Sequence, residues 1–439
     1  MLTSIATAAG STLPASAGAA RAPVLAPVLL MALIVTLQFG PLISLLGFLA
    51  TDDPVFALGG GLRDGLVLVL LALAVLARLG AAHAAPALAS TGWALLFVAA
   101  TVAMALVSRS EFWVTALNFR RLALVPLLVV AILWLPWSAR QIDRAFALIV
   151  ATSLLVVLSG FAERLAPEAL WTDTLKIEAF TAANGFDKFG RLAYHTSGRF
   201  FSWDLAWLTG GPWRRMVSTY LEPTTLAAGL AALLCFALAR HARGHPSMPL
   251  VLCAIAGGAL TLSKGFLLFL PLLLFWLALG SGLVQYLVAL VVLIATLATA
   301  VALGNELTGA FVHVEGLATG VSHLLAGNWL GEGLGVAGGL SNDHVEAGHE
   351  SGFGTLLAQV GVAGFLHLGW VLALAADVTQ ASRRNRDPGG KFVASWLIFW
   401  TVTYLLSSSS LGVGGNAIGF MGIALYLKGA HQRVGGPAC

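Results

Sequence analysis

Residues 24–50 read "VLAPVLLMALIVTLQFGPLISLLGFLA", an apolar run without a single charged side chain. The hydrocarbon core of a bilayer is about 30 Å thick, and a helix needs roughly 20 apolar residues to cross it. Pro41 predicts a kink or an early end of this helix. Of the 439 residues, 58% are hydrophobic and only 10% are charged, whereas soluble domains carry about 25% charged residues. The chain is therefore predicted to be a polytopic membrane protein.

Eleven further apolar runs of similar character follow the first. The twelve predicted spans lie near 24–50, 64–80, 88–107, 118–138, 144–165, 219–240, 248–262, 265–280, 284–304, 353–377, 392–409 and 412–428. Only "LSKG" separates the seventh from the eighth, which indicates a tight hairpin or one broken helix. The pattern predicts an all-α fold with about twelve transmembrane helices.

The distribution of Lys and Arg predicts the orientation, because these residues concentrate in short cytoplasmic loops. With the N-terminus inside, twelve of them fall in inside segments. Five fall in short outside loops: Arg63, Arg109, Arg120, Arg121 and Lys264. Both termini are therefore predicted to be cytoplasmic. Residues 1–20 lack a basic segment at their start, so they are interpreted as a cytoplasmic tail and not as a cleaved signal peptide.

Two long polar segments fall on the outside in this topology, and segments of this length are usually functional or disordered. The first carries several Trp and Phe residues, which favours packing at the membrane interface. The predicted division is a tail (1–23), an N-terminal bundle (24–165), a long outside loop (166–218), central helices (219–304), a second outside loop (305–352), C-terminal helices (353–428) and a tail (429–439).

Basic residues on the outside oppose the orientation rule, so they require a reason. Ionisable residues at membrane depth are costly and often functional, and the guanidinium fork of arginine suits phosphate oxygens. One interpretation is an outward-facing site for a diphosphate. The other is that these residues bind lipid headgroups. The candidates are Arg120, Arg121, Arg214, Arg215 and Lys264.

The stretch "RRMVSTYLEPTTLAAGL", residues 214–230, predicts the start of a span. Pro223 suits the first turn of a helix, where its missing N–H costs nothing, and Thr224 or Thr225 could cap that helix. Glu222 lies close in sequence to the two arginines. It is interpreted either as part of a simple salt bridge or as a carboxylate that orients Arg215.

Residues 344–364 read "HVEAGHESGFGTLLAQVGVAG", a polar stretch at the mouth of an apolar helix. His349 or Glu350 is either a helix cap or a general base towards a sugar hydroxyl. The spacing of His344 and His349 matches no zincin pattern, so no metal is expected. "GLGVAG" at 333–338 is not embedded in a βαβ unit and is interpreted as a turn.

The remaining composition excludes several classes of function. No run of like charges indicates nucleic-acid binding. The three cysteines form no CxxC or Cys/His pattern, so neither a zinc site nor a disulfide framework is predicted. The chain shows no fixed-period repeat of the kind expected for an inverted-repeat transporter, which makes a lipid-linked saccharide transporter the weaker alternative to an enzyme.

The ordered motifs resemble the O-antigen ligase/polymerase superfamily of bacterial envelope proteins. The matching segments cover most of the second half, and "NFRR" resembles an arginine-bearing segment earlier in that family. The others are Arg215 with "STYLEPTTLA", then "TLSKG" at 261–265, "WLGEGLG" at 329–335 and "ESGFGTLLAQVGVAGF" at 350–365. Ligases place His before Asn, Ser or Gln at the polar pair. Here the pair is Glu350–Ser351, with His349 one residue early, which is more similar to polymerases of the Wzy type.

This resemblance implies a GT-C-like fold with two periplasmic loops in the bacterial inner membrane. It implies an inverting, metal-independent glycosyltransferase that needs no cofactor and polymerises repeat units at the periplasmic face. The expected partners are a donor and an acceptor glycan linked to undecaprenyl diphosphate, membrane lipid and a chain-length regulator protein. The alternative is a ligase that transfers glycan to lipid A–core or to protein. By motif, Arg215 matches the diphosphate-binding arginine, Arg121 and Lys264 are helpers, and the base is Glu350 or His349.

Overall fold

The computed structural model describes residues 25–51, 58–80, 88–183, 201–202, 210–279, 288, 291, 308–336 and 351–435. These residues form an all-α membrane protein whose only β-structure, within those ranges, is a two-residue antiparallel pair. The N-terminal helices are α1 (Leu25–Thr51), α2 (Leu58–Gly80), α3 (Ala89–Val107), α4 (Phe112–Trp134), α5 (Ala139–Leu165), η1 (Leu170–Thr174) and α6 (Ile177–Thr181).

The strands β1 (Phe201–Ser202) and β2 (Trp213–Arg214) and the short helix η3 (Ser218–Tyr220) come next. The remaining helices are α9 (Pro223–Ala242), α10 (Met248–Leu260), α11 (Lys264–Leu279), α13 (Thr308–Leu325), α14 (Gly352–Val360), η4 (Gly361–Ala363), α15 (Gly364–Arg384), α16 (Gly390–Leu406), η5 (Ser408–Leu411) and α17 (Gly414–Gly435).

Six helical stretches are long and apolar enough to cross a membrane. They are Leu25–Thr51, Ala89–Val107, Phe112–Trp134, Ala139–Leu165, Pro223–Ala242 and Gly352–Arg384, and each coincides with a predicted span. Five more predicted spans are helices as well, namely α2, α10, α11, α16 and α17. The predicted span 284–304 lies outside the described residues apart from 288 and 291. A total of twelve spans therefore stays a prediction.

Four predictions about individual elements have definite outcomes. α1 continues through Pro41 to Thr51, so the expected early end is wrong. "LSKG" joins two separate helices, α10 and α11. The predicted span 353–377 is interrupted at η4, where Gly361 has a φ of +58° that favours glycine. The segment expected as a second outside loop also contains α13, an 18-residue helix.

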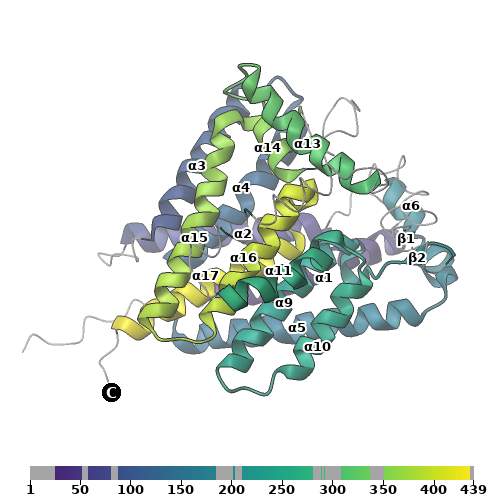
Figure 1. Cartoon of the computed structure of the whole chain (residues 1–439), viewed down its shortest axis with the longest axis horizontal. Coiled ribbons are helices and arrows are strands. Elements are labelled where there is room, and N and C mark those ends of the chain that lie inside the picture. Colours follow the sequence, from purple (N-terminus) through teal and green to yellow (C-terminus); the bar gives the residue numbers. More distant parts are fainter. Residues whose placement is uncertain are drawn as a thin grey trace, which may run out of the picture.

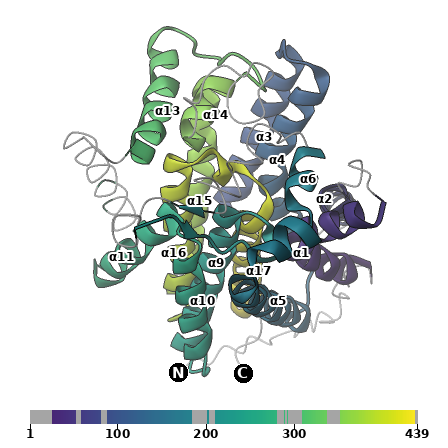
Figure 2. The same ribbon diagram turned by 90° about the vertical axis from the view of Figure 1, so that its right-hand side faces the viewer.

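The centre of the molecule is built from α9, α15, α16 and α17. Figure 2 shows these helices in the middle, with α11 on one flank and α1 and α2 on the other. Large aromatic side chains fill the space between them, and Trp370 stacks on Phe420 with ring centroids 4.8 Å apart. α17 packs closely on this layer because Gly419 lies directly against the ring of Trp396. This rigid centre holds the helix ends that form the site.

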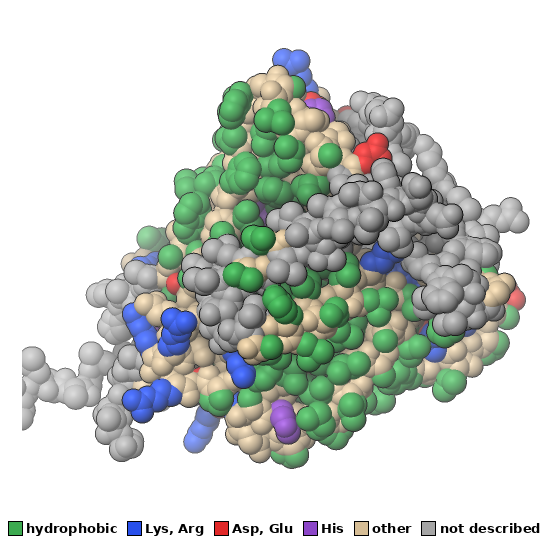
Figure 3. Space-filling view, in the orientation of Figure 1, with side chains coloured by type: hydrophobic (Ala, Val, Ile, Leu, Met, Phe, Trp, Pro, Cys, Tyr) green, Lys and Arg blue, Asp and Glu red, His purple; other side chains and the backbone are tan. Residues whose placement is uncertain are grey.

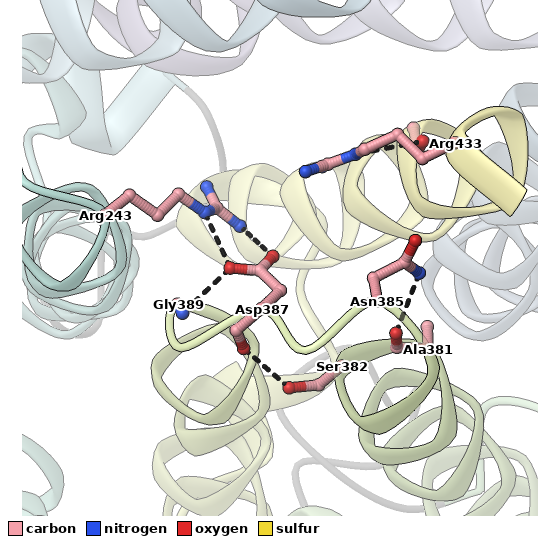
Figure 4. Close-up of polar contacts among 8 residues, drawn as sticks. Arg243, Ala381, Ser382, Asn385, Asp387, Gly389 and Arg433 are labelled. Atoms are coloured by element: carbon pink, nitrogen blue, oxygen red, sulfur yellow. Dashed lines mark hydrogen bonds and ion pairs between the residues drawn. The ribbon is translucent and has the colours of Figure 1, made fainter. Parts of the chain in front are cut away.

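α16 runs opposite to α9 and α17, because it starts beside Ala239 at the end of α9 and finishes at the turn that contacts Thr224 at the start of α9. The ends of these central helices, which lie side by side in Figure 1, therefore gather at two opposite ends of the bundle. Figure 3 shows Lys and Arg side chains concentrated where α15 and α17 finish. At that end Arg243, after α9, makes a two-pronged ion pair with Asp387 in the α15–α16 loop, at 2.9 and 2.6 Å (Figure 4). We call it the basic end. The opposite end, which we call the site end, carries the starts of α9, α11 and α17 and the finish of α16.

Candidate active site

Two neighbouring arginines, Arg214 at the end of β2 and Arg215 directly after it, have different partners. Arg214 forms an ion pair with the buried carboxylate of Glu163, with 2.8 Å between Nη2 and Oε1, and donates to the carbonyl of Ala166. The other oxygen of Glu163 accepts the backbone N–H of Val217. Arg214 therefore fastens the segment 213–217 to the end of α5, and its observed contacts explain it as a structural residue.

Arg215 faces the α10–α11 turn. Its Nε donates to the carbonyl oxygen of Thr261 at 2.8 Å, and the next residue, Met216, donates its backbone N–H to Leu260. The arginine motif and the "TLSKG" motif, 46 residues apart in the chain, are thus brought together. Lys264 begins α11 directly after this turn. The structure therefore joins two of the predicted basic residues in one place.

The backbone around these two motifs takes uncommon conformations. Ser218, Leu221 and Leu262 have φ angles of +49°, +53° and +49°, although non-glycine residues rarely adopt positive φ. Buried hydrogen bonds hold the segment: Ser218 Oγ donates to the carbonyl of Val156 and Thr219 Oγ1 to that of Gln38. Strained backbone of this kind clusters at functional sites, where surrounding contacts maintain it.

Glu222 is the N-cap of α9. Its carboxylate accepts the backbone N–H groups of Thr224 and Thr225, at 3.1 and 2.5 Å, and the hydroxyl of Thr224. Pro223 occupies the first turn as predicted. The expectation that Thr224 or Thr225 caps the helix is wrong, since the glutamate accepts their amides instead. A carboxylate suits this position because the N-terminus of a helix carries partial positive charge.

A polar turn between α16 and α17 lies at the centre of the site. We define residues 407–412 as the serine turn. Ser409 Oγ lies 3.2 Å from Thr224 Oγ1, and Asn416 holds the turn by donating to the carbonyl of Ser410 at 3.1 Å. Gly265 packs on Thr403, whose carbonyl accepts the N–H of Ser407. The serine turn therefore contacts the start of α9 and lies next to the start of α11.

The segment that follows Glu350 reaches the same turn. Ser351 is fully buried and caps α14, where its Oγ accepts the N–H of Gly354 at 3.1 Å. A Cβ atom on Gly352 would lie 2.6 Å from Ser410 Oγ and 2.9 Å from the carbonyl oxygens of Ser407 and Tyr404. Ser351 is thus the cap of this helix. His349 and Glu350 lie outside the described residues, but the position next to Glu350 is defined.

The side chains of the other two predicted arginines, Arg120 and Arg121, have different surroundings. Arg120 pairs with Asp64 of α2, with 2.5 Å between Nε and Oδ2, on the α2–α4 side of the bundle. Arg121 lines a small internal pocket with Ser410 and Asn416, on the inner side of the serine turn. Arg121 therefore belongs to the surroundings of the site, whereas the ion pair of Arg120 gives it a structural role.

The glycine motifs form a second junction, at the finish of α14. The "WLGEGLG" turn runs beside the break between α14 and α15, where Glu332 and Gly333 donate to the carbonyls of Ala358 and Gln359. Val362 donates in return to the carbonyl of Trp329. A side chain on Gly331 or Gly361 would overlap the facing backbone. The two motifs therefore need glycine because their backbones touch.

The serine turn and Asn416, which holds it, were not identified from the sequence. Four consecutive serines at 407–410, flanked by apolar stretches, were the available signal. His367 was also missed. It is buried beneath the turn, where Nδ1 lies 3.2 Å from the hydroxyl of Tyr404 and Trp370 and Trp400 surround the ring. A single histidine in an apolar span carries no spacing that reveals such an environment.

Comparison with known proteins adds no family to this description: no family model matches the chain, and no curated protein matches it either.

Proposed function

We propose that this protein is an inverting, metal-independent glycosyltransferase that polymerises oligosaccharide repeat units carried on undecaprenyl diphosphate. The observation that carries the proposal is the meeting of separate motifs at one end of the bundle. Arg215 binds the "TLSKG" turn, and the serine turn contacts both Thr224 beside Glu222 and Gly352 beside Ser351. Three sequence segments that resemble one enzyme superfamily thus lie around one polar turn.

The proposed chemistry assigns a role to each group. Arg215, with Lys264, binds the diphosphate of the donor and stabilises the negative charge that develops as it leaves, an electrostatic contribution to catalysis. Glu350 or His349 accepts the proton of the acceptor hydroxyl. The acceptor oxygen forms a bond to the anomeric carbon while the bond from that carbon to the diphosphate oxygen breaks. A single displacement of this kind inverts the anomeric centre and releases undecaprenyl diphosphate.

The proposal requires the site to face the periplasm, where lipid-linked repeat units are polymerised. The excess of Lys and Arg at the basic end supports that orientation, because such residues concentrate on the cytoplasmic side. The polar residues of the candidate site lie at the opposite end, at the mouths of helices. This distribution favours an enzyme over a transporter, whose polar residues would lie deep in paired spans.

The test uses purified protein in lipid vesicles together with lipid-linked repeat units. Product length on a gel is expected to fall to single units for Arg215→Ala and for one of Glu350→Gln and His349→Ala. Arg109→Ala is the matched control, because Arg109 is an exposed arginine in the α3–α4 turn, outside the candidate site, and wild-type product is expected from it. Wild-type chain length in all three site variants would overturn the site assignment.

The same assay distinguishes the polymerase from a ligase. A polymerase extends the product when the lipid-linked repeat unit is the only acceptor offered. A ligase produces nothing until lipid A–core or an acceptor protein is added. Elution of each variant as a single species in size-exclusion chromatography establishes that a lost product reflects chemistry and not unfolding.

A further inference from the structure

The length of α15 and the arginines at its end indicate where the bilayer lies. Its 21 residues extend over about 31 Å at 1.5 Å per residue, which matches a hydrocarbon core of about 30 Å. Arg383 and Arg384 end the helix, and arginines at a span terminus mark the headgroup level. The other terminus, Gly364, therefore lies near the opposite boundary of the core.

The turn 326–336 is held at that same boundary. Its backbone bonds to residues 358–362, directly before α15, and the carbonyl of Leu334 accepts the hydroxyl of Ser108 at 2.9 Å. The α3–α4 turn is thereby attached to it, and Figure 1 shows α3, α13 and α14 reaching the apex of the molecule. Three connections from distant parts of the sequence therefore share one level of the membrane.

Large apolar side chains project outward from these connections. We call them the apical patch: Phe112, Trp113, Leu325, Trp329 and Leu330, each between 63% and 83% exposed. The patch continues the outer face of α3, where Leu106 and Val107 are also exposed. Figure 3 shows hydrophobic side chains along this edge up to the apex. The patch is thus continuous with the surface of a predicted span that faces lipid.

Charged and polar side chains are interleaved with the patch. Arg109 and Glu111 are exposed beside Phe112. Glu332, which follows Trp329 and Leu330 in the same turn, pairs with His323, with 2.7 Å between Oε1 and Nδ1. Tryptophan beside charged residues is typical of the membrane–water interface, where the ring sits at the headgroup level. A surface buried against a second protein is instead depleted of charge at its core.

We propose that the apical patch is inserted into the interfacial layer of one leaflet and that phospholipid is its partner. The turn 326–336, predicted from sequence to belong to the second outside loop, then anchors the α13–α14 junction to the bilayer surface. This inference rests on burial, position and charge alone, so it holds whether or not the proposed activity is correct.

The experiment places a fluorescent nitrobenzoxadiazole probe on Trp329→Cys and Leu330→Cys. Cys253 and Cys439 are replaced by serine, and buried Cys235 is retained. The full chain is reconstituted in phosphatidylethanolamine–phosphatidylglycerol vesicles that contain doxyl-labelled lipid. We expect strong quenching by doxyl near the headgroup, weaker quenching by doxyl deep in the acyl chain, and little quenching by aqueous iodide.

Two further sites calibrate the result. A probe at Leu96, exposed on the middle of α3, should respond most to deep doxyl lipid. A probe at Asp173, exposed in η1, should respond to iodide. Iodide quenching at positions 329 and 330 equal to that at 173 would overturn the proposal. Protection from both quenchers would overturn it as well, because it would mean that protein, such as a second copy of the chain, covers the patch.

Discussion

At the residue scale, Arg214 and Arg215 show that two adjacent residues of the same type can have different roles. Arg214 forms an ion pair with the buried carboxylate of Glu163, which also accepts the backbone N–H of Val217. Arg215 bonds through Nε to a carbonyl in a turn that begins another helix. The first contact stabilises the fold, whereas the second positions a guanidinium beside the start of α11, where substrate binding is proposed.

Substitutions of Arg214 and Arg215 should therefore have different effects on stability and on product formation. Removing one partner of a buried ion pair leaves an uncompensated charge and costs about 3–5 kcal/mol. We expect Arg214→Ala to lower the melting temperature in detergent, measured by tryptophan fluorescence, and Glu163→Gln to do the same. Arg215→Ala should melt close to the wild type while product formation is lost. Equal melting temperatures for Arg214→Ala and the wild type would contradict this division.

At the element scale, glycine decides how α13 and α14 meet. A Cβ atom on Gly354 would overlap the carbonyl of Gly316, and one on Gly320 would overlap the backbone of Gly354. Small residues four apart, as in "GLATG" at 316–320, let helix backbones approach closely in membranes. The start of α14, and with it the position of Ser351, therefore depends on this contact.

A methyl group at Gly354 should push the two helices apart. Overpacking of a tight contact costs about 1–3 kcal/mol, so Gly354→Ala is expected to lower the melting temperature and reduce product formation together. Gly61→Ala on α2 is the control, since a Cβ there meets nothing within 4 Å. Both variants are measured by thermal unfolding. An unchanged melting temperature for Gly354→Ala would contradict close packing between α13 and α14.

At the scale of the whole molecule, the ion pair between Arg243 and Asp387 closes the basic end. It joins the end of α9 to the α15–α16 loop, and Asp387 also accepts the N–H of Gly389 at 2.9 Å (Figure 4). Burial opposes the charge on Asp387, but the hydrogen bonds and charge of Arg243 outweigh it, so the pKa of the Asp387 carboxyl is lowered. The loops that carry the positive charge are thereby held together.

This pair predicts a pH dependence of stability. Because folding lowers the pKa of Asp387, its stabilisation is present above the ordinary aspartate pKa of about 4 and is lost as the pH falls through the lowered value. Asp387→Asn should therefore reduce the melting temperature at pH 7, and its difference from the wild type should shrink towards pH 3. Asp143→Asn, an exposed carboxylate near the start of α5, should differ little at either pH. A difference in melting temperature between Asp387→Asn and the wild type that stays constant with pH would contradict the assignment of this difference to the ion pair.

Much of the architecture could be predicted because the bilayer imposes it locally. A run such as residues 24–50 must be a helix, since lipid offers no partner for its backbone groups. Pro223 likewise indicated the start of α9 from the sequence alone. Residues 305–352 were harder, because neither their composition nor their length distinguishes an aqueous loop from α13 packed on another helix.

From the amino-acid sequence it was possible to predict an all-α membrane protein, the positions of most helices and the contrast between a basic end and a polar one. Those properties follow from hydropathy and charge, which act over one span at a time. The folded chain was needed to show that Arg214 supports the fold, that Glu222 caps α9, and that the serine turn joins the starts of α9 and α14. These outcomes depend on contacts between residues up to 185 positions apart, and no local pattern encodes which partner each side chain meets.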